Sequence, residues 1–412
     1  MAARRVLLLD HTARWSGGEI ALFRFLAVLD KTRYTPFVVL GEPGDFADKL
    51  LGIGVETVIE PLGSAVGETR KDTLGAAGLA RKAVSAGSAL LGYAKRVAAI
   101  ARRERCELIH CNSLKSDVYG LIAGRMSGLP VVWHVRDHVS PEYLPGIAVR
   151  GLRAAARRFP AHVICNSRST RLSLFGGDDA AMNTAANRAR FSVVEDCVDE
   201  SFLAPAPPAS RRTWREPGDT RPLHIGIIGR LTRWKGQHVF LAAAKIAAQK
   251  WHEAGNTVPL RFVIAGAALF GETEYEARIR EQAGRDFADS AIEWRGNVAN
   301  IPALLAELDI MAHASISPEP FGQVVIEAMA AGVPVVGTNG GGVADIIKSG
   351  TNGLLVPMND ADALADALIT LLCDADMATR LTASGWQTVR DRYLPERTAR
   401  QIEAVYAGLL AR

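Results

Sequence analysis

The chain has 412 residues, of which 48% are hydrophobic and 22% are charged, and this composition excludes a disordered, collagen-like or disulfide-framework protein. The net charge of +4 is too small to indicate a nucleic-acid partner, so none is expected. Residues 1–200 carry 27 Lys and Arg against 21 Asp and Glu. This uneven distribution indicates either an anionic partner of the N-terminal half or solvated helix faces.

The cysteines and the N-terminus indicate the compartment. The five cysteines show no C-x-x-C spacing, which disfavours a zinc site or a disulfide framework. Cys106, Cys165 and Cys197 lie in or beside apolar runs and are expected to be buried. The apolar run Val6–Leu9 is too short for a signal-peptide core. The sequence contains no run of about 18 uncharged apolar residues, so no membrane-spanning helix is expected. We expect a cytoplasmic protein, at most peripheral on the inner face of the membrane.

The first half of the chain alternates short apolar runs with helical patterns, which is typical of a doubly wound parallel sheet. The runs that predict strands are Val6–Leu9, Phe37–Leu40, Leu108–His110, Val131–Trp133 and His162–Cys165. Gly17 and Gly18 follow the first of these strands and precede a predicted helix at Ile20–Leu29. Glycines at a helix N-terminus let the backbone approach an oxygen-rich ligand, although an ordinary strand–helix turn has the same pattern.

A Pro-rich polar segment at 206–221 predicts a linker, after which the same alternation begins again. Strands are expected at His224–Ile228, Arg261–Ala265, Ile310–Ala312 and Val333–Gly337. We therefore predict two Rossmann-like α/β domains, at 1–205 and 222–394, followed by a helix within 395–412. Open α/β sheets bind ligands at the carboxyl ends of their strands, so we expect the active site in a cleft between two facing domains, made of residues that directly follow strands.

Arg230 and Lys235 follow the first strand of the second domain, five residues apart, around the start of a helix. A guanidinium and an ammonium in this position suit a pyrophosphate group and can neutralise it without a metal; exposed charges near a loop are the alternative. A dinucleotide site of the NAD type is not predicted, because the glycines are spaced differently and the next strand, Phe262–Gly266, is not followed by an acid.

Glu319 and Glu327 are eight residues apart in the segment that starts at Ser317. Pro318, Pro320 and Gly322 predict a loop around Glu319, whereas Glu327 falls in an otherwise apolar helix. A buried carboxylate needs hydrogen-bond donors. Ribose and sugar hydroxyls supply such donors, and a structural arginine beside Glu327 is the alternative. The glycine run at 340–342 again indicates close approach of the backbone to phosphate or sugar.

Taken together, these motifs resemble retaining glycosyltransferases of family 4, which have the two-domain GT-B fold. The motifs that carry the resemblance are Gly17-Gly18, Gly229-Arg230 with Lys235-Gly236, Glu319-x7-Glu327 followed by Ala-Met-Ala, the segment Gly341–Asp345, and Asn352-Gly353. The resemblance spans the chain and is densest in residues 224–357. It implies a transferase that moves a hexose-type sugar from a UDP- or GDP-linked donor to a glycan or lipid-linked acceptor in cell-envelope polysaccharide or glycolipid synthesis.

The resemblance also implies roles for individual residues. Arg230 and Lys235 hold the donor diphosphate, Glu327 holds the ribose, and Glu319 binds the transferred sugar. Further contacts to the donor are expected at Gly17, Gly18, Phe321, Gly322 and Gln323. His134 ends a predicted strand where the family often has a histidine lining the sugar site; a histidine at a strand end is equally often a packing or hydrogen-bonding residue. The final helix is expected to pack back on the N-terminal domain. The roles of Asp137 and Asp345 stay open, and backbone near Gly296 is the expected base site.

No metal or other cofactor is expected. The two Asp-x-Asp segments, Asp360–Asp362 and Asp374–Asp376, lie beside helical patterns, where helix capping explains them better than metal binding. Two basic series, at 81–105 and 150–171, suggest docking on an anionic membrane, with solvated helix faces as the alternative. Two other functions remain open: a GT-B sugar-nucleotide epimerase or hydrolase, and a sugar-nucleotide-binding subunit without catalysis.

Overall fold

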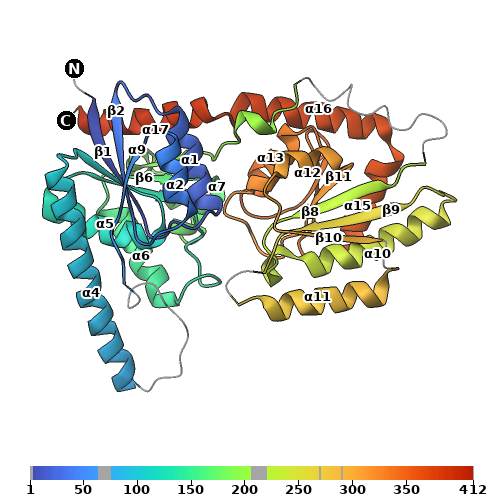
Figure 1. The fold of residues 1–412 in the computed structure, drawn as a ribbon, viewed down its shortest axis with the longest axis horizontal. Helices are drawn as coiled ribbons and strands as arrows, with labels where there is room; N and C mark the ends of the chain where they lie inside the picture. The colour runs from blue at the N-terminus through green and yellow to red at the C-terminus, as the bar shows by residue number, and fades with distance from the viewer. Residues whose placement is uncertain (1–2, 64–75, 206–219, 269–270, 289–290, 412) are drawn as a thin grey trace. The chain divides into compact units, whose positions relative to one another are not determined.

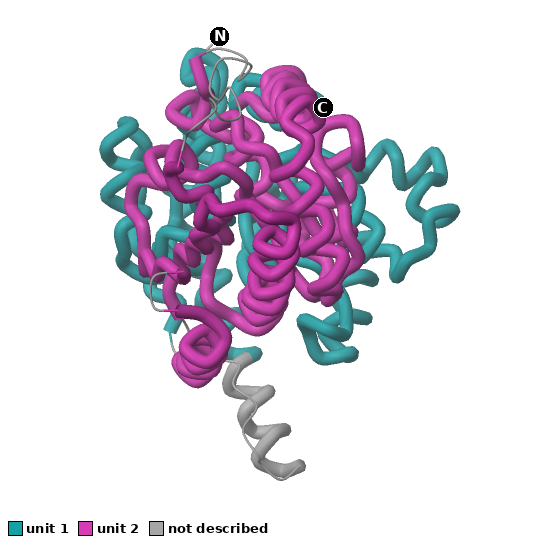
Figure 2. Tube along the Cα trace, turned by 90° about the vertical axis from the view of Figure 1, so that its right-hand side faces the viewer, with its two compact units in different colours: residues 1–196, 395–412 teal, residues 197–394 magenta. Residues whose placement is uncertain are grey.

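A computed structural model describes residues 3–63, 76–205, 220–268, 271–288 and 291–411 of the chain. For residues 76–86 it describes the backbone alone. The chain forms two compact units (Figures 1 and 2). Unit 1 comprises Met1–Asp196 with Pro395–Arg412, and unit 2 comprises Cys197–Leu394. Within the described residues, each unit contains one parallel sheet with helices packed on it. The predicted class, two Rossmann-like doubly wound parallel-sheet domains, is therefore confirmed.

The sheet of unit 1 has seven strands in the order β3-β2-β1-β4-β5-β6-β7. Every strand pairing in it is parallel. The strands are β1 (Arg4–Asp10), β2 (Tyr34–Leu40), β3 (Glu56–Ile59), β4 (Leu108–Cys111), β5 (Val131–Val135), β6 (His162–Cys165) and β7 (Phe191–Val193). The direction of strand order reverses between β1 and β4, and such a switch point is where open α/β sheets bind their ligands.

The helices between these strands are α1 (Gly17–Val28), α2 (Asp45–Gly52), α4 (Ala76–Arg103), α5 (Leu114–Ser127), α6 (Gly146–Arg158), α7 (Arg168–Leu174), α8 (Asp179–Met182) and α9 (Ala185–Arg190). Unit 1 also contains α17 (Pro395–Leu410), from the end of the chain. Cys106, Cys165 and Cys197 are buried, as the apolar runs predicted.

The sheet of unit 2 has six strands in the order β10-β9-β8-β11-β12-β13, again all parallel. The strands are β8 (Leu223–Ile228), β9 (Leu260–Ala265), β10 (Ile292–Gly296), β11 (Ile310–His313), β12 (Val335–Thr338) and β13 (Leu354–Val356). The switch point lies between β8 and β11. The elements that follow these two strands therefore contribute the residues of a candidate ligand site in this unit.

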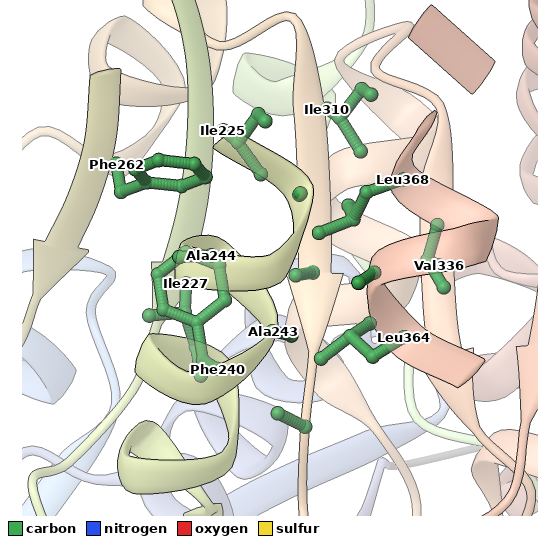
Figure 3. Packing of buried hydrophobic residues seen from close by; sticks show 14 of the residues in the cluster. Ile225, Ile227, Phe240, Ala243, Ala244, Phe262, Ile310, Val336, Leu364 and Leu368 are labelled. Carbon is green, nitrogen blue, oxygen red and sulfur yellow. The ribbon is translucent and has the colours of Figure 1, made fainter. Parts of the chain in front are cut away.

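Helices cover the sheet of unit 2. They are α10 (Gln237–Glu253), α11 (Thr273–Asp286), α12 (Ile301–Glu307), α13 (Gln323–Ala330), α14 (Val343–Ile346), α15 (Ala361–Cys373) and α16 (Ala375–Arg392), with short 3-10 turns at Glu200–Phe202 (η1) and Arg233–Lys235 (η3). Figure 3 shows the core, in which Phe240 of α10 and Leu364 of α15 pack among Ile225, Phe262 and Ile310 of the strands. This apolar layer fixes the strands whose carboxyl ends carry the polar residues.

The boundary between the units differs from the sequence prediction. Residues 197–205, expected in the first domain, belong to unit 2. The amide of Val198 donates to the carbonyl of Tyr393 over 2.9 Å, and the amide of Ala204 donates to the carbonyl of Ala330 over 3.0 Å. These backbone bonds hold the segment against α13 and the end of α16. Residues 206–219 of the expected linker lie outside the described part of the chain.

Helix α17 belongs to unit 1 although it ends the chain. Ile402 and Tyr406 are fully buried with Leu22 and Phe25 of α1. The Glu403 carboxylate accepts the backbone amide of Asp30 over 3.0 Å. The helix therefore completes the apolar core on one face of the first sheet.

Candidate functional site

The donor-site residues predicted in the second half of the chain gather at the switch point of unit 2. After β8, the chain passes Gly229 and Arg230 and makes the turn η3, which ends at Lys235. Gly236 follows with φ of +72°, and a Cβ atom there would lie 1.9 Å from the carbonyl oxygen of Ala314. Only glycine allows this close approach of the backbone, which brings Lys235 against the segment that follows β11.

Lys235 forms an ion pair with Glu319. Its Nζ atom lies 2.6 Å from Oε1 of Glu319, and both side chains are mostly buried. Nε2 of His313 lies 2.8 Å from the same oxygen, and the hydroxyl of Ser315 also donates to it. Burial by itself raises the pKa of Glu319, but Lys235 and His313 outweigh burial and hold that pKa well below its usual range. Glu319 is therefore a carboxylate held by Lys235, His313 and Ser315.

Arg230 and Lys235 meet around one indole ring. The guanidinium carbon of Arg230 lies 5.9 Å from the ring centroid of Trp234, and Nζ of Lys235 lies 4.4 Å from the same centroid. The side-chain amide of Gln237 donates to the carbonyl of Arg230 over 2.9 Å, which ties this turn to α10. The structure thus brings together the two cations that the sequence suggested for a pyrophosphate.

The glycine run at 340–342 has a structural role that the sequence did not reveal. A Cβ atom on Gly341, whose φ is +63°, would lie 2.0 Å from the backbone oxygen of Glu319. A Cβ atom on Gly342 would lie 2.4 Å from the carbonyl oxygen of Phe321, and the Gly342 amide donates to the Glu319 carbonyl over 2.8 Å. In this structure the close backbone approach is to the Glu319 segment itself, so the glycines hold Glu319 in place.

The remaining donor-site candidates surround the start of α13. Gly322 precedes this helix with φ of +120°, and Phe321 is buried against Tyr393, with ring centroids 5.9 Å apart. The side-chain amide of Gln323 donates to the carbonyl of Cys197 over 2.9 Å. Glu327 lies within the helix and is 8% exposed. The structure therefore places Glu319 in a loop and Glu327 in the helix that follows it.

Two other predicted features, Gly296 and the Asp-x-Asp segments, lie on other elements than this cluster. Gly296 ends β10, two strands from β8, where its carbonyl accepts the amide of Gly266 over 2.7 Å. Asp360 and Asp374 each cap a helix: their carboxylates accept the amides of Ala363 and Met377 over 2.9 and 2.8 Å. This capping is the interpretation that the sequence favoured for the Asp-x-Asp segments. Asp345 lies in the first turn of α14.

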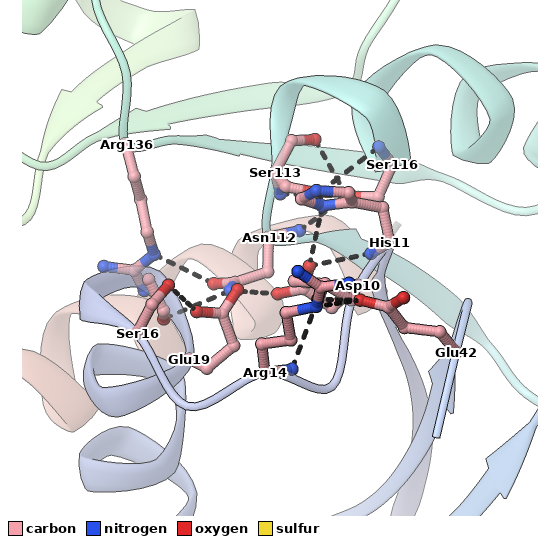
Figure 4. A network of polar contacts seen from close by, with 12 residues as sticks. Asp10, His11, Arg14, Ser16, Glu19, Glu42, Asn112, Ser113, Ser116 and Arg136 are labelled. Carbon is pink, nitrogen blue, oxygen red and sulfur yellow. Dashed lines mark hydrogen bonds and ion pairs between the residues drawn. The ribbon is translucent and has the colours of Figure 1, made fainter. Parts of the chain in front are cut away.

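Unit 1 has its own polar network at the switch point between β1 and β4 (Figure 4). Asp10, the last residue of β1, is completely buried and accepts the side-chain amide of Asn112 over 2.7 Å. Asn112 directly follows β4 and also donates to the carbonyl of Gly18 over 3.2 Å. Nε of Arg136, which directly follows β5, donates to the Asn112 side chain over 2.9 Å. The network therefore ties three strand ends to the glycine turn.

Gly17 and Gly18 form the first turn of α1 above this network. A Cβ atom on Gly18 would lie 3.8 Å from Cδ of Arg136, which is ordinary contact, and one on Gly17 would meet nothing within 4 Å. The hydroxyl of Ser16 donates to Glu19, which is 4% exposed. Burial, and then the charge of Asp10, raise the pKa of Glu19 to about 7. A carboxyl group with a raised pKa thus lies beside the glycine turn.

His134 lies behind Arg136 and is 1% exposed. Nη2 of Arg136 donates to its Nδ1 atom over 3.3 Å, and Nε2 of His110 lies 3.2 Å from the same atom. Burial, then Arg136 and His110, hold the pKa of His134 well below its usual range. The ring is therefore neutral and accepts at Nδ1. The sequence left two interpretations of this side chain, one lining the sugar site and one packing or hydrogen bonding; in this structure it is buried and accepts a hydrogen bond from Arg136.

Two further bonds extend the network of His134. The hydroxyl of Tyr406 on α17 lies 2.7 Å from Nδ1 of His110. Because His110 must donate from Nε2 to the acceptor Nδ1 of His134, its own Nδ1 accepts the Tyr406 hydroxyl proton. On the other side, Arg136 forms an ion pair with the buried Asp196. The C-terminal helix is thus linked to Arg136 through two neutral histidines.

Sequence reasoning missed several residues that these two networks contain. They are Asp10, Glu19, Asn112, Arg136 and Asp196 in unit 1, and His313 and Ser315 in unit 2. Asp10 and His313 are the last residues of strands, and Asn112 and Arg136 directly follow strands. Ligands bind at the carboxyl ends of parallel strands. The position of these four residues at strand ends is therefore the sequence signal that could have identified them.

Among the described residues, none of the helices combines the length and the hydrophobicity that crossing a membrane requires. The basic residues of the two predicted series lie mostly at the surface. In α4 and the turn after it, the exposed members are Lys95, Arg96, Arg102, Arg103 and Arg105. The exposed members of the second series are Arg150, Arg157 and Arg158 in α6 and Arg168 at the start of α7. The side chains of Arg81 and Lys82 lie outside the described part of the structure.

Comparisons with known proteins agree with this arrangement. The family described as "Glycosyl transferases group 1" matches residues 211–387, and "Glycosyltransferase Family 4" matches residues 72–176. HepE of Anabaena, crystallised with UDP and glucose, superposes with a TM-score of 0.78 at 25% identity and covers 98% of this chain and 99% of its own. The sheets, the helices and their order are therefore those of a GT-B protein.

Curated relatives are named as glycosyltransferases. D-inositol 3-phosphate glycosyltransferase of Corynebacterium urealyticum is 32% identical over 54% of this chain, but the match spans only 52% of that relative. Lipopolysaccharide core biosynthesis mannosyltransferase LpsB of Rhizobium meliloti is 27% identical over 69% of this chain and 82% of its own. D-inositol 3-phosphate glycosyltransferase of Paenarthrobacter aurescens is 30% identical over 69% of this chain and 70% of its own. The chain belongs to the family 4 glycosyltransferases of the GT-B fold.

Proposed function

We propose that this glycosyltransferase moves a hexose-type sugar from a UDP- or GDP-linked donor, with retention of configuration, to a glycan or lipid-linked acceptor. The observation that carries the proposal is the cluster of Lys235, Glu319 and His313 at the switch point of unit 2, with Arg230 on the same indole as Lys235. This cluster combines cations for a diphosphate with a carboxylate for sugar hydroxyls. The UDP and glucose bound to HepE support a nucleotide-sugar donor.

In the proposed reaction, cleavage of the anomeric C–O bond leaves a diphosphate with an additional negative charge. Arg230 and Lys235 stabilise that charge as it develops, which is the main electrostatic task in this chemistry. Among the described residues, Lys235, His313 and Ser315 contact the Glu319 carboxylate at Oε1, so we assign Oε2 as the oxygen that accepts a sugar hydroxyl. Glu327 binds the ribose hydroxyls. No metal or other cofactor takes part in the proposed reaction.

Other parts of the site complete the donor contacts. The backbone at Phe321, Gly322 and Gln323 contacts the sugar, and that near Gly296 contacts the base. In unit 1, the amides of Gly17 and Gly18 contact phosphate or sugar at the N-terminus of α1, where the helix dipole favours negative charge. His134 is buried, so its proposed part in the site is to orient Arg136, whose guanidinium it contacts. Retention follows from attack by the acceptor on the face that the diphosphate leaves, with a leaving-group oxygen accepting the acceptor proton.

The proposed acceptor belongs to cell-envelope polysaccharide or glycolipid synthesis, as the name of the Rhizobium meliloti relative suggests. The exposed basic residues of α4 and α6 would then rest on the anionic inner face of the membrane, since clustered Lys and Arg bind such surfaces. Co-sedimentation with vesicles tests this docking. Stronger binding to vesicles with anionic lipid than to neutral vesicles is expected, and equal binding to both contradicts it.

A thermal-shift panel of UDP, GDP and their sugar conjugates tests the donor. The correct nucleotide raises the melting temperature, because a ligand that binds only the folded chain stabilises it. Incubation with candidate acceptors then yields a product whose anomeric configuration, read by NMR, matches that of the donor. Fast loss of the donor sugar without acceptor indicates the epimerase or hydrolase instead. Binding without turnover on any acceptor indicates a non-catalytic subunit.

A further inference from the structure

His313 is a buried histidine whose two ring nitrogens both have partners. It ends β11 and is 4% exposed. Nε2 lies 2.8 Å from Oε1 of Glu319, and Nδ1 lies 3.1 Å from the hydroxyl oxygen of Thr338. Since a neutral imidazole has one donor nitrogen and one acceptor nitrogen, the partners decide which nitrogens carry protons.

The partners require a proton on each nitrogen. The Thr338 hydroxyl donates its only proton to the carbonyl of Ser315 over 2.9 Å, so toward His313 it accepts, and Nδ1 must donate. The Ser315 hydroxyl donates to Glu319 and has no proton left for Nε2, which lies 3.2 Å away. Glu319 as a carboxylate accepts only, so Nε2 must donate as well.

We propose that His313 is an imidazolium that serves as the positioning residue for Glu319 and that allows Lys235 to leave Glu319 for the donor diphosphate. Glu319 contacts this ring, Lys235 shares the same oxygen of Glu319, and Arg230 lies over the Trp234 ring that Lys235 also contacts. With His313 protonated, the group of Lys235, His313 and Glu319 has a net charge of +1. The proposal rests on the proposed function only where it assigns Lys235 to the diphosphate.

The need for a second cation follows from the ion pair itself. Glu319 is 5% exposed, and a buried carboxylate that loses its only cation is strongly destabilised. If Lys235 were the only cation beside Glu319, its transfer to a phosphate would carry that penalty. His313 and Ser315 remain on Oε1 when Lys235 moves, so the carboxylate keeps both charge compensation and orientation. Lys235 is then able to serve the nucleotide.

The protonation of His313 is measured without any ligand. In protein labelled with 15N-histidine, a long-range 1H–15N correlation spectrum at neutral pH should show both nitrogens of His313 in the protonated form. The His313→Gln variant assigns the signal by its disappearance. His110 is the internal control, because burial and Arg136 lower its pKa to about 3 and it should show one protonated nitrogen. A single protonated nitrogen on His313 overturns the proposal.

The release of Lys235 is measured by titrating UDP and GDP into four forms of the full chain: wild type, His313→Gln, Glu319→Gln and the double variant. His313→Gln should weaken nucleotide binding about tenfold, since it removes a charged hydrogen bond and leaves Lys235 held by Glu319. Glu319→Gln in the same chain should restore most of that affinity, because Lys235 then has no carboxylate to leave. If His313 had only a structural role, Glu319→Gln would not restore the affinity. Failure of the double variant to recover nucleotide affinity therefore contradicts the proposal.

Thr338→Val is the second variant, used if His313→Gln does not fold. It keeps the shape of the side chain and removes the acceptor of Nδ1, so the long-range spectrum at neutral pH should show one protonated nitrogen on His313 instead of two. Two protonated nitrogens on His313 in this variant overturn the proposal. If the wild-type chain binds neither UDP nor GDP, the proposed donor is wrong, and the NMR measurement alone decides the state of His313.

Discussion

Lys235 and Glu319 are separated by 84 residues in the sequence, yet their charged atoms are 2.6 Å apart. The contact depends on Gly236, where the backbone presses against the segment after β11, and on Gly341, which packs on Glu319 itself. Each partner was recognised in the sequence as a candidate ligand contact. Their pairing was not, because it depends on how two distant loops meet.

The first prediction concerns Lys235. The change Lys235→Ala removes a charged contact to the diphosphate, each such contact contributing about 1.5–3 kcal/mol, so the affinity for the nucleotide should fall about 10- to 100-fold. Arg230→Ala should act in the same direction. Isothermal titration measures both. Lys245→Ala is the matched control: Lys245 lies on α10 in an exposed ion pair with Asp286, and its loss should leave affinity unchanged. Nucleotide affinity unaffected by Lys235→Ala contradicts the donor site.

Glu19 gives a prediction about pH. Its pKa is raised from 4.5 to about 7, by burial first and then by Asp10. The folded chain therefore binds this proton more tightly than the unfolded chain, so stability falls as pH rises from about 4.5 to about 7 and then levels off. The shift corresponds to at most about 3 kcal/mol.

The change Glu19→Gln removes this dependence while it keeps an oxygen for Ser16. The variant should gain stability over the wild type at pH 8 and show little difference at pH 4.5, as measured by urea denaturation at both values. Glu274→Gln is the control, because Glu274 lies in the first turn of α11 with an 84% exposed side chain. An equal gain at both pH values shows that the carboxyl of Glu19 is not the source.

The sequence predicted the site residues unevenly, and the reason is physical. Arg230, Lys235, Glu319 and Glu327 lie within motifs whose loop or helix context is local, so one segment suffices to find them. Arg136 becomes meaningful only through Asn112 and Asp196, which come from other strands. A histidine at a strand end, such as His134, looks the same in the sequence whether it is buried or open to a ligand.

At the level of elements, the buried strands were found and the irregular ones were missed. The apolar runs at β1, β2, β4, β5 and β6 identified those strands to within a few residues. β3 and β10 lack a continuous run of buried apolar residues, and β7 has only three residues, so none of them shows the pattern of a buried strand. Two of these, β3 and β7, are edge strands of the first sheet, and β10 is an edge of the second. Edge strands are covered less and need fewer apolar residues.

The glycine turn before α14 gives a prediction at this scale. Gly341→Ala places a Cβ atom within 2.0 Å of the Glu319 backbone, at a φ of +63°, so the turn must move away from Glu319. Stability should fall by more than about 2 kcal/mol, and nucleotide affinity should fall with it. Gly350→Ala is the matched control: its φ is +76° but no atom lies within 4 Å. That change costs only about 1 kcal/mol of backbone strain. Denaturation curves measure the change in stability, and nucleotide titrations measure the change in affinity. Equal effects of Gly341→Ala and Gly350→Ala contradict the packing argument.

For the whole chain, alternation of strands and helices was enough to predict two domains of one class. It was not enough to place the boundary. Residues 197–205 join unit 2 because their backbone bonds go to Ala330 and Tyr393, and no local pattern records those partners. Likewise, α17 follows unit 2 directly in the sequence, yet its apolar face is buried in unit 1. Long-range partners, rather than propensities, decide which unit a terminal segment completes.

The position of α17 leads to the last prediction. A chain that ends at Leu394 lacks the helix and exposes the apolar surface of Leu22, Phe25 and Tyr34 that Ile402 and Tyr406 cover. Burial of one large apolar side chain contributes about 1.5–3 kcal/mol, so unit 1 should lose at least about 3 kcal/mol of stability. In calorimetry, the transition of unit 1 should move to lower temperature, while that of unit 2, which still holds Lys235 and Glu319, should stay in place and still shift with the nucleotide. Loss of both transitions together would mean that the two units unfold as one, and the assignment of the helix to unit 1 alone would be wrong.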